Sequence, residues 1–398
     1  MRRSYKYRAY INKTTEANAL SWLRICQQLY NKALEQRIKN YEEIKKDKEN
    51  PDNDTKIKRI SKYDQYALIK KKDHPEYKDI DAQCLEQVVL RLDEAYKHFF
   101  RRVKEKKGKA GFPKFQSWDR YNSFTLRQSG WKLEDNTLYI RNVGRCRLKM
   151  HRPFEGDIKT VTIKKEVNKW YVIFSCENVS EKPLPSTGKA IGIDVGIKSF
   201  LADSNENIID NPKWFIQAER ELRVKQRRLS RRKKGSNRRR KAREQVAKLH
   251  QRIANRRKDF IYNLTADYIR KFDIIAVENL NIKNMVQSNY RPLNKRIHDA
   301  SWNLFFNHLG HKAEETGKQL IKVKAKDTTQ LCSRCGNKPK VKVELKDRIY
   351  KCKKCGLVMD RDVNAAKNIL GRAVPSGVKF SGYTDLSEKH SQIGCKQP

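Results

Sequence analysis

The chain has 398 residues, enough for two or three domains that each bury a core of their own. Its 90 Lys and Arg residues against 46 Asp and Glu leave a formal net charge of +44, which exceeds what solubility requires and predicts a polyanionic partner. No apolar run approaches the roughly 20 residues that span a bilayer, and the N-terminal segment lacks the apolar core of a signal peptide. We therefore expect a soluble, intracellular protein.

The first hundred residues predict a mainly helical module. Residues 3–11 alternate basic with aromatic or aliphatic side chains, which indicates a strand with one charged face. Residues 16–41 and 85–103 carry apolar side chains at three-to-four spacing and predict two amphipathic helices. Residues 42–80 are rich in lysine, include two prolines and lack a sustained period, so we expect loops and short helices there.

Residues 111–185 change to short alternating segments separated by Gly, Asn and Asp, which predicts a small β domain that could close into a barrel. Its first part sets five aromatic rings among basic and polar residues. Such rings suit base stacking, but they also suit a β core, and packing is the commoner role. The rings are Phe112, Phe115, Trp118, Tyr121 and Phe124.

After a linker at 181–189 and an apolar strand, AIGIDV, the sequence predicts a basic helical hairpin over residues 217–270 that turns near KKGSN. Residues 220–258 hold nineteen Lys or Arg against two Glu. Like charges repel at three and four spacing on a helix, so we favour phosphate contact over a merely solvated face. The candidate nucleic-acid-binding residues are Arg227, Arg228, Arg231, Arg232, Lys233, Lys234, Arg238, Arg239 and Arg240.

Three acidic residues occupy positions where a charge is costly. Asp194 lies within the apolar strand, Glu278 ends a second apolar strand, FDIIAVENL, and Asp362 heads the expected helix VNAAKNILGRA. Taken singly, they could be a turn acid, a surface residue at a strand end and a helix N-cap. Together, in a basic protein, they suit a two-metal phosphodiesterase, in which carboxylates hold two hard cations about 4 Å apart.

Two C-x-x-C pairs predict a metal site. Cys332 and Cys335 are separated by sixteen residues from Cys352 and Cys355, a spacing typical of structural zinc. A glycine follows each pair and permits the tight turn that directs both sulfurs inward. Four thiolates leave no open coordination position, so we expect a structural ion. The other five cysteines are scattered and are expected to be small apolar fillers: Cys26, Cys84, Cys146, Cys176 and Cys395.

The motifs GIDVGIKSF, AVENL, CSRCG with CKKCG, and DRDVNAAKNIL closely resemble the TnpB nucleases of insertion sequences, relatives of the compact type V CRISPR effectors. QQLYNKAL, LDEAYKHFFRRVK, GFPKF and LSRRKKGS extend this resemblance over about residues 1–370. The resemblance implies that Asp194, Glu278 and Asp362 are catalytic acids and that the four paired cysteines bind zinc. Asp362 is preferred to Asp360 because the family's acid immediately precedes the x-N-A-A run.

The resemblance also implies a multi-domain α+β architecture with an RNase H-like (RuvC) nuclease domain, a zinc-knuckle insert, a wedge β-barrel domain and a helical recognition module. The expected boundaries are residues 1–12 for the first wedge strand, 13–110 for the recognition module, 111–185 for the wedge barrel, 186–325 for the RuvC domain with its basic hairpin, 326–358 for the zinc-knuckle insert that binds target nucleic acid, 359–373 for the third RuvC motif and 374–398 for a flexible tail.

As a function, the resemblance implies an RNA-guided DNA endonuclease of the prokaryotic cytoplasm, associated with the nucleoid. It would bind a guide RNA, recognise a short motif beside the target and hydrolyse double-stranded DNA with two Mg²⁺ (or Mn²⁺) ions, and it would carry one structural Zn²⁺. The alternatives are a guided repressor, which the intact acids disfavour, and an RNase H-like strand transferase. The sequence departs from the family pattern at Asp327 and Thr329 and after Ala373.

Overall fold

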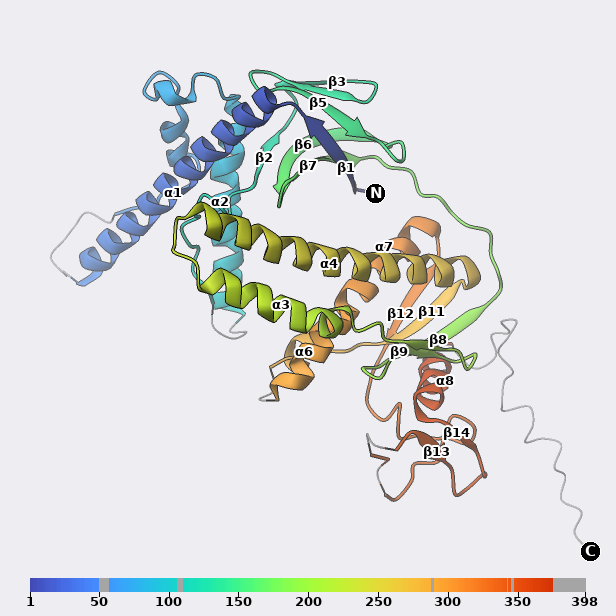
Figure 1. The fold of residues 1–398 in the computed structure, drawn as a ribbon. Coiled ribbons are helices and arrows are strands. Elements are labelled where there is room, and N and C mark those ends of the chain that lie inside the picture. The colour runs from blue at the N-terminus through green and yellow to red at the C-terminus, as the bar shows by residue number, and fades with distance from the viewer. Residues whose placement is uncertain (50–56, 106–109, 288–289, 342, 345–346, 375–398) are drawn as a thin grey trace, which may run out of the picture. The chain divides into compact units, whose positions relative to one another are not determined.

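The structure is a computed structural model that describes residues 1–49, 57–105, 110–287, 290–341, 343–344 and 347–374 (Figure 1). It divides into two compact units, Met1–Ser180 and Glu181–Pro398. Across the described ranges, no helix combines the length and the apolarity needed to cross a membrane. The expected flexible tail and Cys395 lie outside the described residues.

The first unit contains a seven-stranded sheet with the order β2-β6-β7-β1-β5-β4-β3. The strands are β1 (Arg3–Ile11), β2 (Ser123–Leu126), β3 (Trp131–Glu134), β4 (Thr137–Ile140), β5 (Gly144–Lys149), β6 (Asp157–Glu166) and β7 (Lys169–Glu177). The strand predicted at residues 3–11 is confirmed. It lies antiparallel between β5 and β7, and it buries Tyr5, Tyr7 and Ala9 on one face as alternation requires.

The helices of this unit are α1 (Lys13–Glu49) and α2 (Ala82–Lys104), with short 3₁₀ turns at η1 (Asp64–Ile69) and η2 (Pro75–Tyr77). Both predicted amphipathic helices are confirmed, and α1 runs several residues beyond the expected end. The apolar stripe of α2 packs on α1, with the Cys26 and Cys84 sulfurs 3.8 Å apart. Because both thiols are buried, the expectation that they fill the core is confirmed.

The aromatic segment that opens the β domain divides between two environments. Tyr121 and Phe124 are buried in the core of the first unit, as packing predicts. Phe112, Phe115 and Trp118 are exposed, so the expectation of core packing was wrong for these three rings. They precede β2 in the chain and belong to no strand. The alternating pattern that buries every second side chain of a strand therefore does not apply to them.

The second unit contains a five-stranded sheet with the order β10-β9-β8-β11-β12. Its strands are β8 (Ala190–Val195), β9 (Ser199–Asp203), β10 (Ile208–Asp210), β11 (Ile274–Glu278) and β12 (Gln319–Val323). The first three form an antiparallel meander. β11 then lies parallel to β8 on one side and to β12 on the other. Parallel neighbours end at one common edge of the sheet, where their last residues meet.

Helices cover both faces of this sheet (Figure 1). The helices of this unit are α3 (Trp214–Ser230), α4 (Asn237–Lys271), α5 (Ile282–Met285), α6 (Arg291–Ala300), α7 (Trp302–Thr316) and α8 (Arg361–Ala373), and α3 packs on α4 and not on the sheet. On β8, Ile191 and Ile193 face the core that α4 and α7 complete. Ala190 faces α8 instead, where it packs on Leu370. Because side chains alternate along a strand, Asp194 belongs to the α8 face.

A small cysteine-rich lobe separates β12 from α8 in the chain. It contains a two-stranded sheet of β13 (Ile349–Lys351) and β14 (Val358–Asp360). Its core consists of Tyr350 and Leu357 packed against the cysteines. So small a core gains little from burial alone, which is why a bound metal suits such a lobe.

Candidate active site

Asp194 and Glu278 lie beside each other at the ends of two parallel strands. The register pairs Gly192 with Ala276 and Ile193 with Val277, so the next pair along the two strands is Asp194 with Glu278. Ala276 packs on Ile369 of α8, so alternation places Glu278 on the α8 face as well. Both residues are 9% exposed. The structure thus brings together two of the three predicted acids in a buried position.

Helix α8 brings the third acid to the same face. Asp360, not Asp362, is the N-cap of this helix: its carboxylate accepts from the backbone N–H groups of Asp362 and Val363 at 2.8 and 3.2 Å. The carboxylate of Asp362 is therefore available for other contacts, and the N-cap alternative for Asp362 is wrong. Asp362 is also close enough to Asp194 for its charge to affect that group.

Burial and like charges disfavour ionisation at this site. Burial raises the pKa of Asp194 well above its usual value, and the nearby carboxylates of Glu278 and Asp362 raise it further, against the opposing charge of Arg361. Burial also raises the pKa of Glu278, although the Thr328 hydroxyl and the Arg372 guanidinium oppose this. Two buried carboxyl groups that resist ionisation when alone are suited to bind a hard cation, which stabilises the ionised form.

Two arginines contact the third acid. Arg361 donates from Nη2 and Nε to Asp362 Oδ1 at 2.7 and 3.1 Å, and Arg348 lies with its Nη1 3.5 Å from Oδ2. Within the described ranges, the three acids do not form a group whose ligand atoms all lie within 4.8 Å of one another. To bind a metal ion together with the other two acids, the Asp362 carboxylate would have to give up a contact with an arginine and move toward them.

Sequence reasoning missed Thr328, Arg348 and Arg361 as neighbours of the acids. Thr328 is buried, and its hydroxyl donates to Glu278 Oε1. Arg361 is 7% exposed and donates from Nη1 to the Glu344 carbonyl at 3.1 Å. Only Arg361 had a signal in the sequence, because it lies between two acids at a helix start. Thr328 and Arg348 are separated in sequence from the acids that they contact, so only the fold shows these contacts.

The four predicted zinc ligands form a compact cluster. Their sulfurs all lie within 4.8 Å of one another. The Cys332 and Cys355 sulfurs are 3.6 Å apart, as are those of Cys335 and Cys352. A tetrahedral ion with Zn–S bonds of about 2.3 Å requires sulfurs separated by about 3.8 Å. The residues therefore fit a closed four-thiolate zinc site with no position left for a substrate.

Both cysteine turns have the same backbone geometry. The N–H of Gly336 donates to the Cys332 carbonyl at 2.9 Å, and that of Gly356 donates to the Cys352 carbonyl at 3.0 Å. Both glycines have φ near +70°, which only glycine adopts freely, as the sequence predicted. Burial raises the pKa of Cys352, but backbone N–H groups of Cys355 and Lys354 that donate to its sulfur outweigh this and lower it to about 6. In the other turn, burial and hydrogen bonds with neighbouring thiols outweigh the equivalent backbone N–H groups and raise the pKa of Cys332 to about 12. The backbone N–H groups of both turns thus favour the thiolate form, and burial opposes it.

The basic hairpin predicted over residues 217–270 is formed by α3 and α4. Leu222 packs on Leu249 and Ile253, with Val246 at the edge, so apolar contacts join the two helices. Most of the candidate phosphate-binding side chains are exposed, and their contacts with nucleic acid remain a prediction. Arg239 differs, because its Nη1 donates to the carbonyls of Leu229 and Arg232 at 2.9 Å. It closes the turn of the hairpin.

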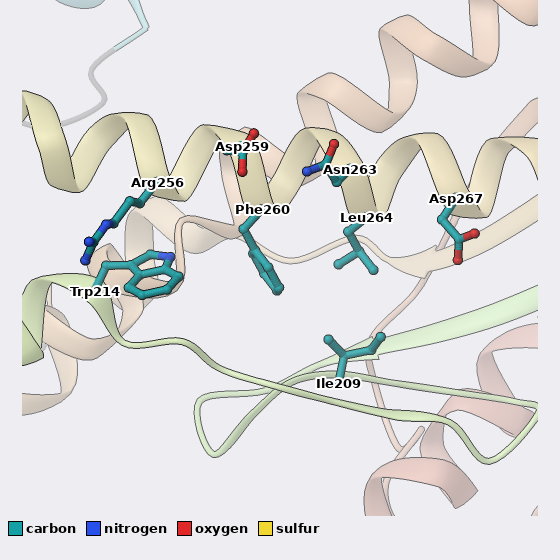
Figure 2. Close-up of a pocket in the computed structure, with 8 residues that line it drawn as sticks. All are labelled: Ile209, Trp214, Arg256, Asp259, Phe260, Asn263, Leu264 and Asp267. Carbon is teal, nitrogen blue, oxygen red and sulfur yellow. The ribbon is translucent and has the colours of Figure 1, made fainter.

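A cavity of about 690 Å³ lies further along α4, between that helix, β10 and the start of α3. Figure 2 shows Phe260 and Leu264 directed from α4 toward Ile209, with Trp214 beside Arg256. The guanidinium of Arg256 is 5.4 Å from the centre of the Trp214 ring. None of the three acids lines this cavity, so the candidate active site is elsewhere, on the α8 face of the sheet.

Family models match three parts of the chain. A model described as "Probable transposase" (OrfB_IS605) matches residues 173–289, and one described as "Cas12f1-like, TNB domain" matches residues 302–369. A third, described as "Helix-turn-helix domain" (HTH_OrfB_IS605), matches residues 1–46. In this structure, that last region contains β1 and most of the single long helix α1.

Two curated relatives match most of the chain. "Putative RNA-guided DNA endonuclease InsQ" of Escherichia coli (strain K12) is 30% identical over 314 residues, which are 75% of this chain and 76% of the relative. "Putative RNA-guided DNA endonuclease" of Streptomyces pristinaespiralis is 29% identical over 395 residues, 98% and 93% of the two chains. A solved Cas12f1–sgRNA–target DNA complex matches at 16% identity with a TM-score of 0.36, over 94% of this chain and 100% of that chain.

Proposed function

Because the chain belongs to the TnpB family of RNA-guided DNA endonucleases, we propose that it cuts double-stranded DNA at sites selected by pairing with a guide RNA. The observation that carries this proposal is the position of Asp194 and Glu278 on adjoining strands of one sheet, on the face covered by α8, with Asp362 in the first turn of that helix. Two buried acids with a third nearby, in a chain of net charge +44, suit metal-dependent hydrolysis of a polyanion.

The strand order supports an RNase H-like (RuvC) nuclease domain. An antiparallel meander is followed by two strands parallel to its first strand, which lies at the centre of the sheet. The acids lie on that central strand, at the end of the neighbouring parallel strand and in the first turn of α8. In open sheets of this kind, sites form outside the carboxyl ends of the parallel strands.

In the proposed reaction, the three acids would hold two divalent ions. When bound, such ions supply an activated water and neutralise charge on the leaving 3′ oxygen. The fold fixes the backbones of Asp194 and Glu278 on adjoining strands, which preorganises the two positions for binding a cation. Burial excludes bulk water from both groups, which strengthens their interaction with a cation or a phosphate. Arg361 and Arg348 place positive charge at the third acid, where a phosphate could also be bound.

We propose that the cysteine cluster holds one structural zinc ion. The sulfur separations and the paired turns support this role, and the closed set of four thiolates supports folding of the lobe and not catalysis. Without the ion, the few apolar residues of this lobe would have to stabilise it alone. With the ion bound, the folded lobe would order the start of α8, which follows β14 directly.

We propose that the exposed basic side chains of the α3–α4 hairpin contact the phosphate backbone of the guide RNA or of the RNA–DNA heteroduplex. Arg and Lys predominate there, and few neutral polar side chains are available to read base edges. A-form duplexes also hide those edges in a narrow major groove. Specificity would then come from base pairing, while the protein holds the polymer by its charge.

Sequencing the RNA that copurifies with the full chain tests the guided part of this proposal. We expect one abundant RNA species in a fixed ratio to the protein, retained at moderate salt. Heterogeneous RNA that salt removes completely would contradict the proposal, because that result is typical of binding through charge alone. The hydrolytic part is tested separately by cleavage.

A further inference from the structure

The segment from Thr328 to Ser333 follows β12, enters the first cysteine turn and contacts the candidate active site. The buried hydroxyl of Thr328 donates to Oε1 of Glu278. Glu278 ends β11, fifty positions away in the chain. A carboxylate that must bind metal has rotatable side-chain bonds, and a hydrogen bond to one oxygen fixes which orientation it presents. Thr328 therefore holds a predicted metal ligand without needing to touch the metal.

Helix α8 binds the same segment through two asparagine side chains one turn apart. Asn368 Nδ2 donates to the carbonyls of Thr328 and Leu331, both at 2.8 Å. Asn364 Nδ2 donates to the Leu331 carbonyl at 2.7 Å, and Asn364 Oδ1 accepts from the Ser333 N–H at 2.9 Å. Because Asp362 belongs to this helix, the segment joins the helix of one acid to the side chain of another.

The Thr328 hydroxyl has two neighbouring acceptors but only one proton. Besides Glu278, the carbonyl of Ala325 lies 3.1 Å from it. The contact with the carboxylate is the closer of the two, and a hydrogen bond to an ionised acceptor is the stronger one. A purely structural hydroxyl would be satisfied by Ala325 alone. The hydrogen bond of Thr328 to Glu278 is therefore the observation that favours a positioning role for this hydroxyl over a purely structural one.

We propose that Thr328 is a positioning residue for the metal-binding carboxylate of Glu278, and that the segment from Thr328 to Ser333 fixes this carboxylate relative to α8 and Asp362. Cys332 belongs to the same segment, so the zinc cluster anchors its far end. This inference rests on the proposed function, because it assigns Glu278 to the metal site. It adds a residue that does not itself bind the ion and that lies on a different element from the acids.

Mn²⁺ binding to the zinc-loaded full-length protein, followed by electron paramagnetic resonance, tests the proposal with three variants. Thr328→Val keeps the shape of the side chain but removes the hydroxyl, Thr328→Ser restores the hydroxyl, and Thr329→Val makes the same change one residue away. Loss of a partner that orients a metal ligand costs about 10- to 100-fold in affinity. We expect that loss for Thr328→Val only, with a parallel rise in the Mn²⁺ concentration needed for cleavage.

Mn²⁺ affinity in Thr328→Val equal to that of the wild type would overturn the proposal, as would an equal loss in Thr328→Ser. If Thr328→Val loses zinc, a zinc-loaded Thr328→Ala variant takes its place, and wild-type Mn²⁺ affinity in that variant has the same meaning. Failure of the wild type to cut DNA with a guide would instead contradict the proposed function. The affinities of the three variants would still decide the role of Thr328.

Discussion

Gly192 on β8 lies directly against the backbone of Ala366 on α8: a Cβ atom at position 192 would be 2.1 Å from the Ala366 carbonyl oxygen. Asp194 is two residues further along the strand, on the same face. Asp362 is four residues before Ala366, on the same side of the helix. The absence of a side chain at Gly192 therefore sets how closely the helix that carries one acid approaches the strand that carries another.

Gly192→Ala should separate α8 from β8 and impair cleavage. Overpacking of this kind costs about 1–3 kcal/mol in the free energy of unfolding, and a displacement of about 1 Å near a reacting group can cost about 100-fold in rate. Gly310→Ala is the control, because its Cβ would make only an ordinary 3.5 Å contact with Leu320. Urea unfolding and cleavage rates measure both. A Gly192→Ala variant as stable and active as Gly310→Ala would show that the contact is not required.

Replacement of each acid by its amide should abolish cleavage and leave binding of RNA and target DNA intact. The variants are Asp194→Asn, Glu278→Gln and Asp362→Asn, and the physical reason is that amides do not supply the charge that holds divalent ions. Asp360→Asn is the matched control, because asparagine also caps a helix well. Cleavage assays and gel-shift binding measure the two effects. Near wild-type cleavage by any one amide variant would remove that residue from the site.

Asp194 should make the magnesium-free protein less stable as the pH rises. Its pKa is raised in the folded state, so the folded chain binds more protons there than the unfolded chain. This contribution is fully present below the unfolded pKa of about 3.9 and is lost as the pH rises through the folded value. In zinc-loaded, magnesium-free buffer at neutral pH, the free energy of unfolding of Asp194→Asn should exceed that of the wild type, and the difference should shrink as the pH falls. A stability difference that does not vary with pH would refute this account.

One zinc ion per chain should bind to the cysteine cluster. Cys332→Ser combined with Cys352→Ser should lose it, with local unfolding of the lobe, because a site of this kind contributes its binding energy to folding. Cys146→Ala removes a buried thiol from the other unit and should retain zinc. Elemental analysis of the purified proteins decides the matter. Unchanged zinc in the double variant would mean that the ion binds elsewhere.

Reversing the charge of the hairpin turn should weaken nucleic-acid binding in a salt-dependent manner. Replacing Arg231, Arg232, Lys233 and Lys234 with Glu, if it removes about three phosphate contacts, should lower the log–log salt slope by roughly two to three. Lys271→Glu is the control, because Lys271 lies at the far end of α4 and is paired with Asp267 at 2.8 Å. The loss should be similar for every guide sequence. An unchanged slope would identify the turn as a solvated surface.

The sequence predicted the features that depend on local patterns. Cysteine spacing indicated the cysteine cluster, and acids inside apolar strands indicated Asp194 and Glu278, because a buried strand tolerates a charge only at a cost. Contacts between distant segments could not be predicted in this way. The hydroxyl of Thr328 reaches Glu278 because β12 ends beside β11. Arg348 reaches Asp362 because the cysteine lobe folds back onto the start of α8.

Structure also corrected the reading of single residues whose types fit several roles. Arg239 is one of many arginines in the basic hairpin, yet it binds backbone carbonyls at the turn. Asp360 and Asp362 are both aspartates near the start of α8, and only the hydrogen bonds show that Asp360 caps the helix. Exposed rings such as Phe115 were expected in the core and lie outside it. In each case, the residue type is compatible with two environments, and the tertiary contacts select one.

Cleavage of a supercoiled plasmid by the purified protein with a defined guide RNA tests the central claim most directly. Four reactions compare a matched with a mismatched guide, each with the wild type and with Asp194→Asn, in Mg²⁺. We predict linear product only for the wild type with the matched guide, and its loss on chelation of the metal. Cutting that ignores the guide, cutting by Asp194→Asn at the wild-type rate, or products in which DNA ends are joined to new strands would contradict a guided, carboxylate-dependent nuclease.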